Sequence, residues 1–189
     1  ERFAEAQADP RVRTIVFRGA GKAFVAGADI RYFVEKIRAG RIADIVAFTR
    51  RGHELLLAIE ESPKPTVALL DGLSLGGGSE LALACRAILA TPAGSLAFPE
   101  TGIGIYPGLG GMLRTARQIG PELAKYFACT GAPISARDAL ELGIACRLVE
   151  PALHRLGARS WPGRAGAAVL AQRRHRADAV REQAALLRL

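Results

Sequence analysis

Residues 66–85 have the sequence TVALLDGLSLGGGSELALAC, in which a strand, a glycine-rich turn and a helix follow one another. The run Thr66–Leu70 is apolar throughout, as expected of a strand that is covered on both faces. Asp71-Gly72 indicates a turn, and the glycines at 76–78 lead into a predicted buried helix over Ser79–Cys85. Such a strand–glycine–helix transition leaves backbone N–H groups uncovered at a helix N-terminus, where a phosphate or an oxyanion can bind.

Strand and helix patterns alternate on both sides of this segment. We expect further strands at residues 13–18, 87–90, 96–98 and 146–149, and helices at 43–61, 109–119, 122–129 and 135–143. Apolar strands separated by helices indicate an α/β domain with mainly parallel pairing. We expect this domain to cover residues 1–151, followed by a basic, helical C-terminal segment over residues 152–189.

The charge of the chain is concentrated near its C-terminus. The net charge is +8, but residues 151–189 contain eight arginines and two acidic residues and so account for +6 of it. The domain before them is nearly neutral, which does not indicate a nucleic-acid-binding surface. The arginines could contact phosphates, so an RNA-binding protein remains an alternative class. The segment has one aromatic residue, Trp161, and no RNA-binding motif, which favours a solvated basic helix.

Residue usage also bears on compartment and metal binding. The three cysteines, Cys85, Cys129 and Cys146, are an odd and widely spaced set, which indicates neither a disulfide framework nor a zinc site. We therefore expect a reducing, cytoplasmic compartment. The three histidines are far apart in the sequence, so no metal site is predicted. No apolar run is long enough to cross a bilayer, and the first residues do not form a secretory signal.

Two further segments place small residues beside polar ones. Residues 21–30, GKAFVAGADI, follow the first strand, and the small residues at 26–28 permit a close backbone approach, although a simple tight loop is an alternative. Residues 98–111, FPETGIGIYPGLGG, place Glu100 among apolar residues and glycines. Burial there would raise the pKa of Glu100, as a general acid requires, unless the residue only caps a turn. Ser79 lacks the closing glycine of a nucleophile elbow.

These three segments, in this order, resemble the crotonase superfamily and, within it, the enoyl-CoA hydratases. The resemblance extends from about Arg11 to Pro151. It implies an α/β fold of the crotonase type, a ββα superhelix or spiral, with a helical C-terminal segment that is short or atypical here. It also implies that strands normally precede the point where this sequence begins. The hydratase part of a larger bifunctional β-oxidation protein would show a similar pattern.

The resemblance implies a role for each matching residue. The N–H groups of Ala28 and Gly77 would form the oxyanion hole. Glu80 would orient and deprotonate a water molecule, and Glu100 would deliver a proton to C2. The residues implied to bind coenzyme A are Lys22, Ala26, Gly27, Asp29 and Ile30, and those implied to line the acyl pocket are Tyr106, Pro107 and Gly108.

The implied reaction is that of a lyase, the syn addition of water to a 2-enoyl-CoA thioester in fatty acid metabolism. No separate cofactor is expected, because coenzyme A is part of the substrate. Members of this family usually form trimers or hexamers, so the resemblance implies a homotrimer or hexamer. The presence of both glutamates favours a hydratase, but one glutamate can suffice for double-bond isomerisation. An enoyl-CoA isomerase or another crotonase-type reaction therefore remains open, and acyl chain length and pathway are not indicated.

Overall fold

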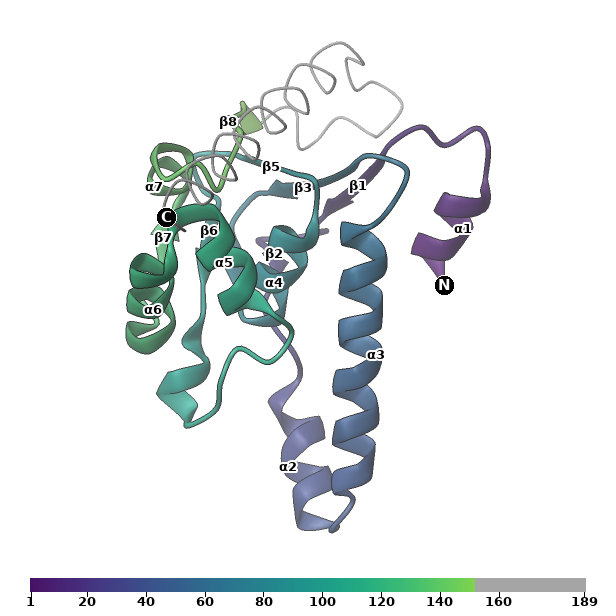
Figure 1. Ribbon diagram of the computed structural model, residues 1–189, viewed down its shortest axis with the longest axis vertical. Coiled ribbons are helices and arrows are strands. Elements are labelled where there is room, and N and C mark those ends of the chain that lie inside the picture. The colour runs from purple at the N-terminus through teal and green to yellow at the C-terminus, as the bar shows by residue number, and fades with distance from the viewer. Residues whose placement is uncertain (152–189) are drawn as a thin grey trace, which may run out of the picture.

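The computed structural model describes residues 1–151, and the predicted basic segment, residues 152–189, lies outside the described residues. Two four-stranded sheets form the centre of the molecule (Figure 1). The first sheet has the strand order β1 (Ile15–Arg18), β3 (Thr66–Leu70), β5 (Ala87–Ala90) and β8 (Arg147–Leu148), all parallel. The second has the order β2 (Ala23–Val25), β4 (Leu73–Leu75), β6 (Ser95–Ala97) and β7 (Ile134–Ser135), of which β7 alone is antiparallel to its neighbour.

Strands β1 to β6 alternate between the two sheets, and at least one helix follows each of their pairs. The helical elements are α1 (Arg2–Ala8), α2 (Ile30–Arg38), α3 (Ile42–Glu60), α4 (Gly77–Ala84), the 3₁₀ helix η1 (Pro99–Ile103), α5 (Gly111–Ile119), α6 (Pro121–Thr130) and α7 (Ala136–Glu141). The pairs β1–β2, β3–β4 and β5–β6 are each followed by at least one helix, which is the predicted ββα spiral. The mainly parallel pairing is also confirmed.

Several short elements were not predicted from the sequence, among them two strands and a helix near the candidate site. Strands β2 and β4 have only three residues each, and the segments that contain them were expected to be loop and turn. Helix α2 was also not predicted. It begins after Asp29, whose carboxylate caps the helix by accepting a hydrogen bond of 3.0 Å from the N–H of Arg31. Strands β3 and β5 have the bounds expected from their apolar runs.

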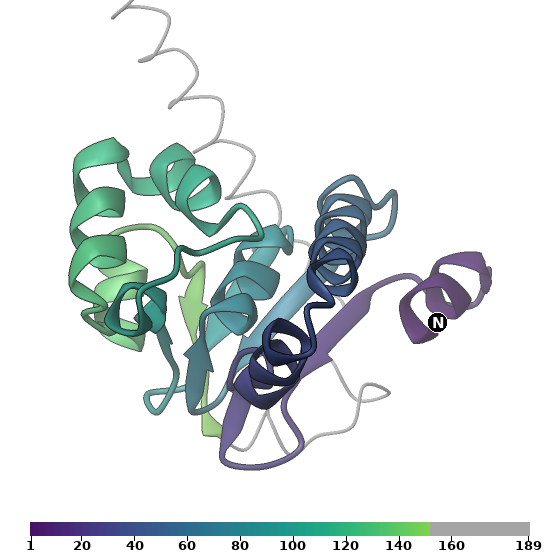
Figure 2. The same cartoon turned by 90° about the horizontal axis from the view of Figure 1, so that it is seen from below.

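Helix α4 lies in the middle of the molecule (Figures 1 and 2). It packs against strands β2, β3 and β4 and against helices α3 and α5. Ala82, Leu83 and Ala84 belong to the main hydrophobic core, which also includes Leu56 and Ile59 of α3. Because α4 is enclosed in this way, any polar side chain on it needs a partner or a functional reason to be there.

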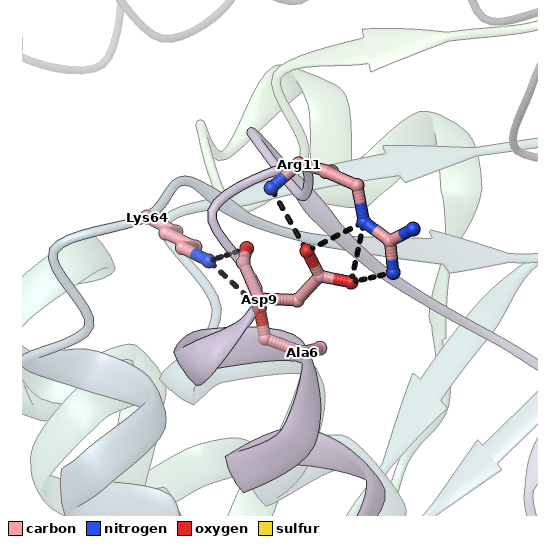
Figure 3. Close-up of polar contacts among 4 residues, drawn as sticks. All are labelled: Ala6, Asp9, Arg11 and Lys64. Carbon is pink, nitrogen blue, oxygen red and sulfur yellow. Dashed lines mark hydrogen bonds and ion pairs between the residues drawn. The ribbon is translucent and has the colours of Figure 1, made fainter.

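The N-terminal helix α1 lies apart from the other helices, beside β1 (Figures 1 and 2). Lys64, which precedes β3, donates hydrogen bonds to the carbonyl oxygens of Ala6 at 2.8 Å and Asp9 at 2.6 Å (Figure 3). The carboxylate of Asp9 is paired with Arg11 at 2.8 Å. Lys64 therefore binds the last carbonyls of α1 and fixes the helix to the start of a central strand.

Candidate active site

The residues predicted for the oxyanion hole and for proton transfer lie at one edge of the second sheet. Strands β2, β4 and β6 are parallel neighbours, so their carboxyl ends lie at the same edge. Ala28 follows the end of β2, Gly77 follows the end of β4, and Glu100 follows the end of β6. Glu80 lies in the first turn of α4, shortly after β4. The parallel pairing thus brings together three segments that are far apart in the sequence.

Two glycines make the close packing at this edge possible. Gly76 has a φ of +51°, a conformation that residues with a side chain rarely adopt. A Cβ at Gly76 would also lie 2.5 Å from Oε1 of Glu100. A Cβ at Gly78 would overlap the carbonyl oxygen of Val25. Gly76 therefore leaves room for the Glu100 carboxyl, and Gly78 lets α4 approach β2.

The backbone N–H groups of Ala28 and Gly77 have no acceptor within residues 1–151. Gly77 is the first residue of α4, and the first N–H groups of a helix lack an intrahelical partner. Ala28 follows Gly27, where a Cβ would lie 3.2 Å from the carbonyl oxygen of Leu75. The loop after β2 is thus in contact with the end of β4, and both N–H groups are free to donate to a ligand at this edge.

Glu80 is almost fully buried, with 1% of its surface exposed. Its Oε1 accepts hydrogen bonds from the N–H of Leu109 at 2.7 Å and from the N–H of Gly111 at 2.9 Å. Burial raises the pKa of Glu80, while these two N–H groups and the nearby charges of Arg114 and His53 oppose the rise. The surroundings therefore supply several interactions that favour the ionised form.

Glu100 is half-buried and has few such interactions. Its Oε2 is shielded from solvent and has no hydrogen-bond partner within residues 1–151. Burial raises the pKa of Glu100, and the charge of Glu80 raises it further, against one opposing hydrogen bond from its own backbone N–H. An unpartnered buried oxygen favours the protonated carboxyl, which can donate a proton to a ligand.

The two carboxyls therefore form an unequal, electrostatically coupled pair. Glu100 lies against Gly76, and the carbonyl oxygen of Gly76 accepts the backbone N–H of Glu80 at 3.0 Å. Their titrations belong to the pair, since the charge of one affects the other. With Glu80 ionised and Glu100 protonated, one group can take a proton and the other can give one at the same edge, which is the arrangement that general acid–base catalysis needs.

Ser79 has a structural role. Its hydroxyl lies 2.7 Å from the carbonyl oxygen of Ser74 and 2.9 Å from that of Ala97, and it accepts the N–H of Ala97 at 3.1 Å. The hydroxyl thus links α4 to β4 and β6. These contacts agree with the expectation that Ser79 is not an activated nucleophile.

The residues predicted for coenzyme A binding lie in the loop before and after β2. Lys22, Ala26, Asp29 and Ile30 are exposed, and Gly27 is partly buried. The Asp29 carboxylate is already used as the cap of α2 and in an ion pair with Arg31 at 3.0 Å. Asp29 can therefore contribute through its backbone, whereas its side chain is committed to the helix.

The residues predicted for the acyl pocket do not share one environment. Tyr106 is 64% exposed, Pro107 is buried and Gly108 is exposed. A groove of about 610 Å³ runs along helix α3, and none of these three residues lines it. The residues that line it are Ile45, Val46, Thr49, Arg50, His53, Glu54, Leu57 and Arg114.

The contacts that hold Glu80 were not predicted from the sequence. Its two donors are backbone N–H groups of Leu109 and Gly111, which lie 29 and 31 residues further along the chain. Arg114, four residues after Gly110, contacts the same loop, and Glu60 of α3 contacts Arg114. The one available signal was the glycine-rich run 108–111 directly before a helix, which indicates exposed backbone groups without identifying their acceptor.

No group of three or more His, Cys, Asp and Glu residues among residues 1–151 could hold a metal ion. No helix in this range is long and apolar enough to cross a membrane.

Comparison with known proteins supports the resemblance inferred from the three segments. The chain is 39% identical over 140 residues to a probable enoyl-CoA hydratase of Bacillus subtilis, covering 74% of this chain and 53% of that protein. It is 38% identical over 144 residues to a crotonyl-CoA hydratase of Syntrophomonas wolfei, covering 76% of this chain and 54% of that protein. The chain thus spans about half the length of these relatives.

The structural comparison gives the same result. The crystal structure of an enoyl-CoA hydratase from Bacillus anthracis matches with a TM-score of 0.72 and 34% identity, over 82% of this chain and 58% of that one. The sequence model of the family described as enoyl-CoA hydratase/isomerase matches residues 1–180. The chain therefore belongs to the enoyl-CoA hydratase/isomerase family.

Proposed function

We propose that the protein is an enoyl-CoA hydratase, a lyase that adds water to the double bond of a 2-enoyl-CoA thioester. One observation carries the proposal: two inequivalent carboxyls, Glu80 and Glu100, lie beside the free N–H groups of Ala28 and Gly77 at one sheet edge. Hydration needs a base, an acid and a site for developing negative charge, and this edge can supply all three. The names of the hydratase relatives support the same reaction.

In the proposed reaction, ionised Glu80 acts on water. Its Oε1 is occupied by the N–H groups of Leu109 and Gly111, so the second oxygen is the one that takes a proton from water. The water oxygen forms a bond to C3 as this proton leaves. The electron pair of the C2=C3 bond moves toward the thioester carbonyl, which becomes an enolate.

The enolate is stabilised and then protonated at the same edge. The N–H groups of Ala28 and Gly77 donate to the thioester oxygen, and one such donor contributes about 3–4 kcal/mol to the transition state. Protonated Glu100 delivers its proton to C2, and syn addition follows because both carboxyls face the same side of the substrate. Proton exchange between the two carboxyls, directly or through water, then restores the starting state.

The remaining predicted contacts are part of the same proposal. Lys22 is proposed to contact the phosphates of coenzyme A, and the backbone of residues 26–30 is proposed to contact its adenine. Tyr106, Pro107 and Gly108 are proposed to contact the acyl chain. Coenzyme A enters as part of the substrate, so the proposal needs no separate cofactor.

We further propose that the active protein is a homotrimer or hexamer that works in the cytoplasm. Exposed apolar side chains on η1, the loop after it, α5 and α6 support an association surface, namely Ile103, Ile105, Tyr106, Leu113, Leu123 and Tyr126. The odd and widely spaced set of cysteines in the sequence is consistent with a reducing compartment. Light scattering of the full chain tests the oligomeric state.

The test of the reaction is hydration of crotonyl-CoA, measured as loss of the ultraviolet absorbance of the enoyl thioester. The full chain and its Glu80→Gln variant are compared under the same conditions. We expect the unmodified full chain to hydrate crotonyl-CoA. The Glu80→Gln variant should lose at least about 100-fold of this activity, since a positioned base is removed. Equal activity in both proteins would refute the role of Glu80.

A folded, CoA-binding protein without hydration activity would refute the hydratase proposal and favour isomerisation, which a 3-enoyl-CoA substrate would reveal. The RNA-binding alternative rests on residues 152–189, which lie outside the described residues. Salt-dependent RNA retention that disappears on deletion of these residues would favour it over the enzyme.

A further inference from the structure

Arg114 is a largely buried cation that the proposed mechanism does not use. Its side chain is 10% exposed. Two of its nitrogens reach one carboxylate oxygen of Glu60, Nε at 3.0 Å and Nη2 at 2.8 Å. The third nitrogen, Nη1, donates to the carbonyl oxygen of Leu109 at 2.8 Å. Arg114 therefore connects helix α3, through Glu60, to the loop that precedes helix α5.

The same loop holds Glu80. Leu109 donates its N–H to Glu80 Oε1 and accepts Arg114 Nη1 on its carbonyl oxygen, so it is fixed from both sides. The peptide unit between Gly110 and Gly111 is fixed in the same way. Its carbonyl oxygen accepts the backbone N–H of Arg114 at 3.0 Å, while its N–H donates to Glu80 at 2.9 Å. The Arg114 guanidinium thus holds the carbonyl oxygen of Leu109, and the backbone N–H of residue 114 holds the Gly110–Gly111 peptide.

The backbone of residues 109–111 has few side chains of its own to restrict its conformation. Gly110 has a φ of +90°, and both it and Gly111 lack side chains that could restrict the backbone. A Cβ at Gly110 would lie 2.7 Å from Arg114 Nη1, which shows how closely the guanidinium covers the loop. Leu109 also packs against Gly52 of α3, and Gly111 lies against Phe98. Loss of the guanidinium would leave a glycine-rich turn free to reorient its N–H groups.

We propose that Arg114, held by Glu60, is a positioning residue that keeps the Leu109–Gly111 loop, and through it Glu80, in the geometry that activates water. This inference rests on the proposed hydratase function. Arg114 acts through backbone groups and does not touch the reacting atoms. Glu60 has the secondary role of orienting the guanidinium toward the loop.

The charges around Glu80 make its pKa a useful measurement. This pKa should change if Arg114 positions Glu80, and a purely structural role of Arg114 would not change it. The groups that act on its pKa are the positive charges of Arg114 and His53, which lower it, and its coupled partner is Glu100. Replacement of the Arg114 side chain takes away one positive charge and the guanidinium bond that helps to hold Leu109, one of the two N–H donors, so the pKa of Glu80 rises. Because Glu80 must be ionised to act, the acidic limb of the kcat/KM profile moves to higher pH.

The experiment uses the full chain with Arg114→Met and measures kcat, KM and the pH profile on crotonyl-CoA. We expect kcat to fall about 100-fold, as for a misplaced catalytic group, with little change in KM. We also expect the acidic limb to move to higher pH. Arg114→Lys retains the charge but cannot make all three contacts, so it should restore the position of the limb and only part of kcat.

Arg117→Met is the matched control. Arg117 contacts the same Glu60 at a longer distance of 3.5 Å, is 61% exposed and has no hydrogen bond to the loop. We expect its kcat and pH profile to match those of the unmodified protein. If Arg114→Met does not fold, Glu60→Gln gives the test through kcat, which should fall by a smaller factor because the guanidinium loses its partner and keeps its charge.

The inference is overturned if folded Arg114→Met keeps the kcat and the acidic limb of the unmodified protein, or if Glu60→Gln in its place keeps the kcat. It is also overturned if Arg117→Met has the same effect as Arg114→Met. If the unmodified protein hydrates no enoyl-CoA, the proposed function fails. In that case the titration of ¹³C-labelled glutamate carboxyls by NMR still tests the inference, because Arg114→Met must raise the pKa of Glu80.

Discussion

The surroundings of the two glutamates differ although their side chains are identical. Glu80 lies in helix α4, and its Oε1 receives two backbone hydrogen bonds. Glu100 lies in η1, where its Oε2 is shielded and has no partner within residues 1–151. Burial raises the pKa of both groups, but strong opposing interactions are present only at Glu80. In the proposed mechanism, the arrangement of donors, rather than the depth of burial, is what distinguishes the base from the acid in this pair.

Removing either titratable group should have the largest effect. Glu80→Gln and Glu100→Gln should each lower kcat by about 100- to 10,000-fold, because each removes one proton transfer. Calorimetry of a saturated acyl-CoA should give nearly unchanged binding, since neither carboxyl is proposed to contact coenzyme A. If Glu100→Gln retained full turnover, the assignment of the acid would be wrong.

Displacing Glu100 without changing it should have the next largest effect. Gly76→Ala places a Cβ 2.5 Å from Oε1 of Glu100 at a φ of +51°. We expect kcat to fall about 100-fold through misplacement of the carboxyl. We also expect the free energy of unfolding to fall by about 1–3 kcal/mol because of backbone strain.

Gly102→Ala is the control for that variant. Gly102 lies in the same 3₁₀ helix as Glu100, and a Cβ there would meet nothing within 4 Å. Its kcat and stability should stay close to those of the unmodified protein. A similar loss in both variants would mean that η1 is sensitive to any alanine and would contradict the steric explanation for Gly76.

Truncation of the two carboxyls should affect stability in different ways. Glu80→Ala leaves the N–H groups of Leu109 and Gly111 without their acceptor, so we expect a loss of about 2 kcal/mol in the free energy of unfolding. Glu100→Ala removes an oxygen that has no partner, so no comparable loss is expected. Urea denaturation of both variants measures the difference. Equal losses would show that the two environments are equivalent.

The smallest expected effect is the pH dependence of stability. The pKa of Glu100 is raised in the folded protein, so the folded state binds more protons than the unfolded state between the ordinary pKa and the raised one. The free energy of unfolding therefore falls as pH rises through this window. Glu100→Gln should remove that part of the slope. An unchanged slope in the variant would contradict a raised pKa for Glu100.

The elements that the sequence predicted well are those with a strong local pattern. Strands β3 and β5 are continuous apolar runs and have the predicted bounds. Strands β2 and β4 were missed because three residues are too few to show a period. Helix α2 was missed because its cap, Asp29, lies in a segment that matched a binding loop.

The candidate site, like the fold, could be predicted from the sequence only in part. Glu100 could be selected from the sequence because a carboxyl among glycines and apolar residues is unusual, whereas Glu80 was selected through the family resemblance of its segment. The donors of Leu109 and Gly111 could not be selected, since every residue except proline carries a backbone N–H and only the fold decides which ones point at Glu80. Arg114 was missed because its partners, Glu60 and Leu109, come together only in the tertiary structure.

The free N–H groups of Ala28 and Gly77 have a consequence for how such proteins diversify. These donors belong to the main chain, so replacement of most side chains leaves them in place as long as strands β2 and β4 stay paired. In the proposed reaction they serve the thioester oxygen, whereas the carboxyls decide where protons go. Mutation can therefore change the reaction at positions 80 and 100 while the ability to form an enolate is inherited with the fold. A family whose description spans hydratases and isomerases is what such a division of labour would produce.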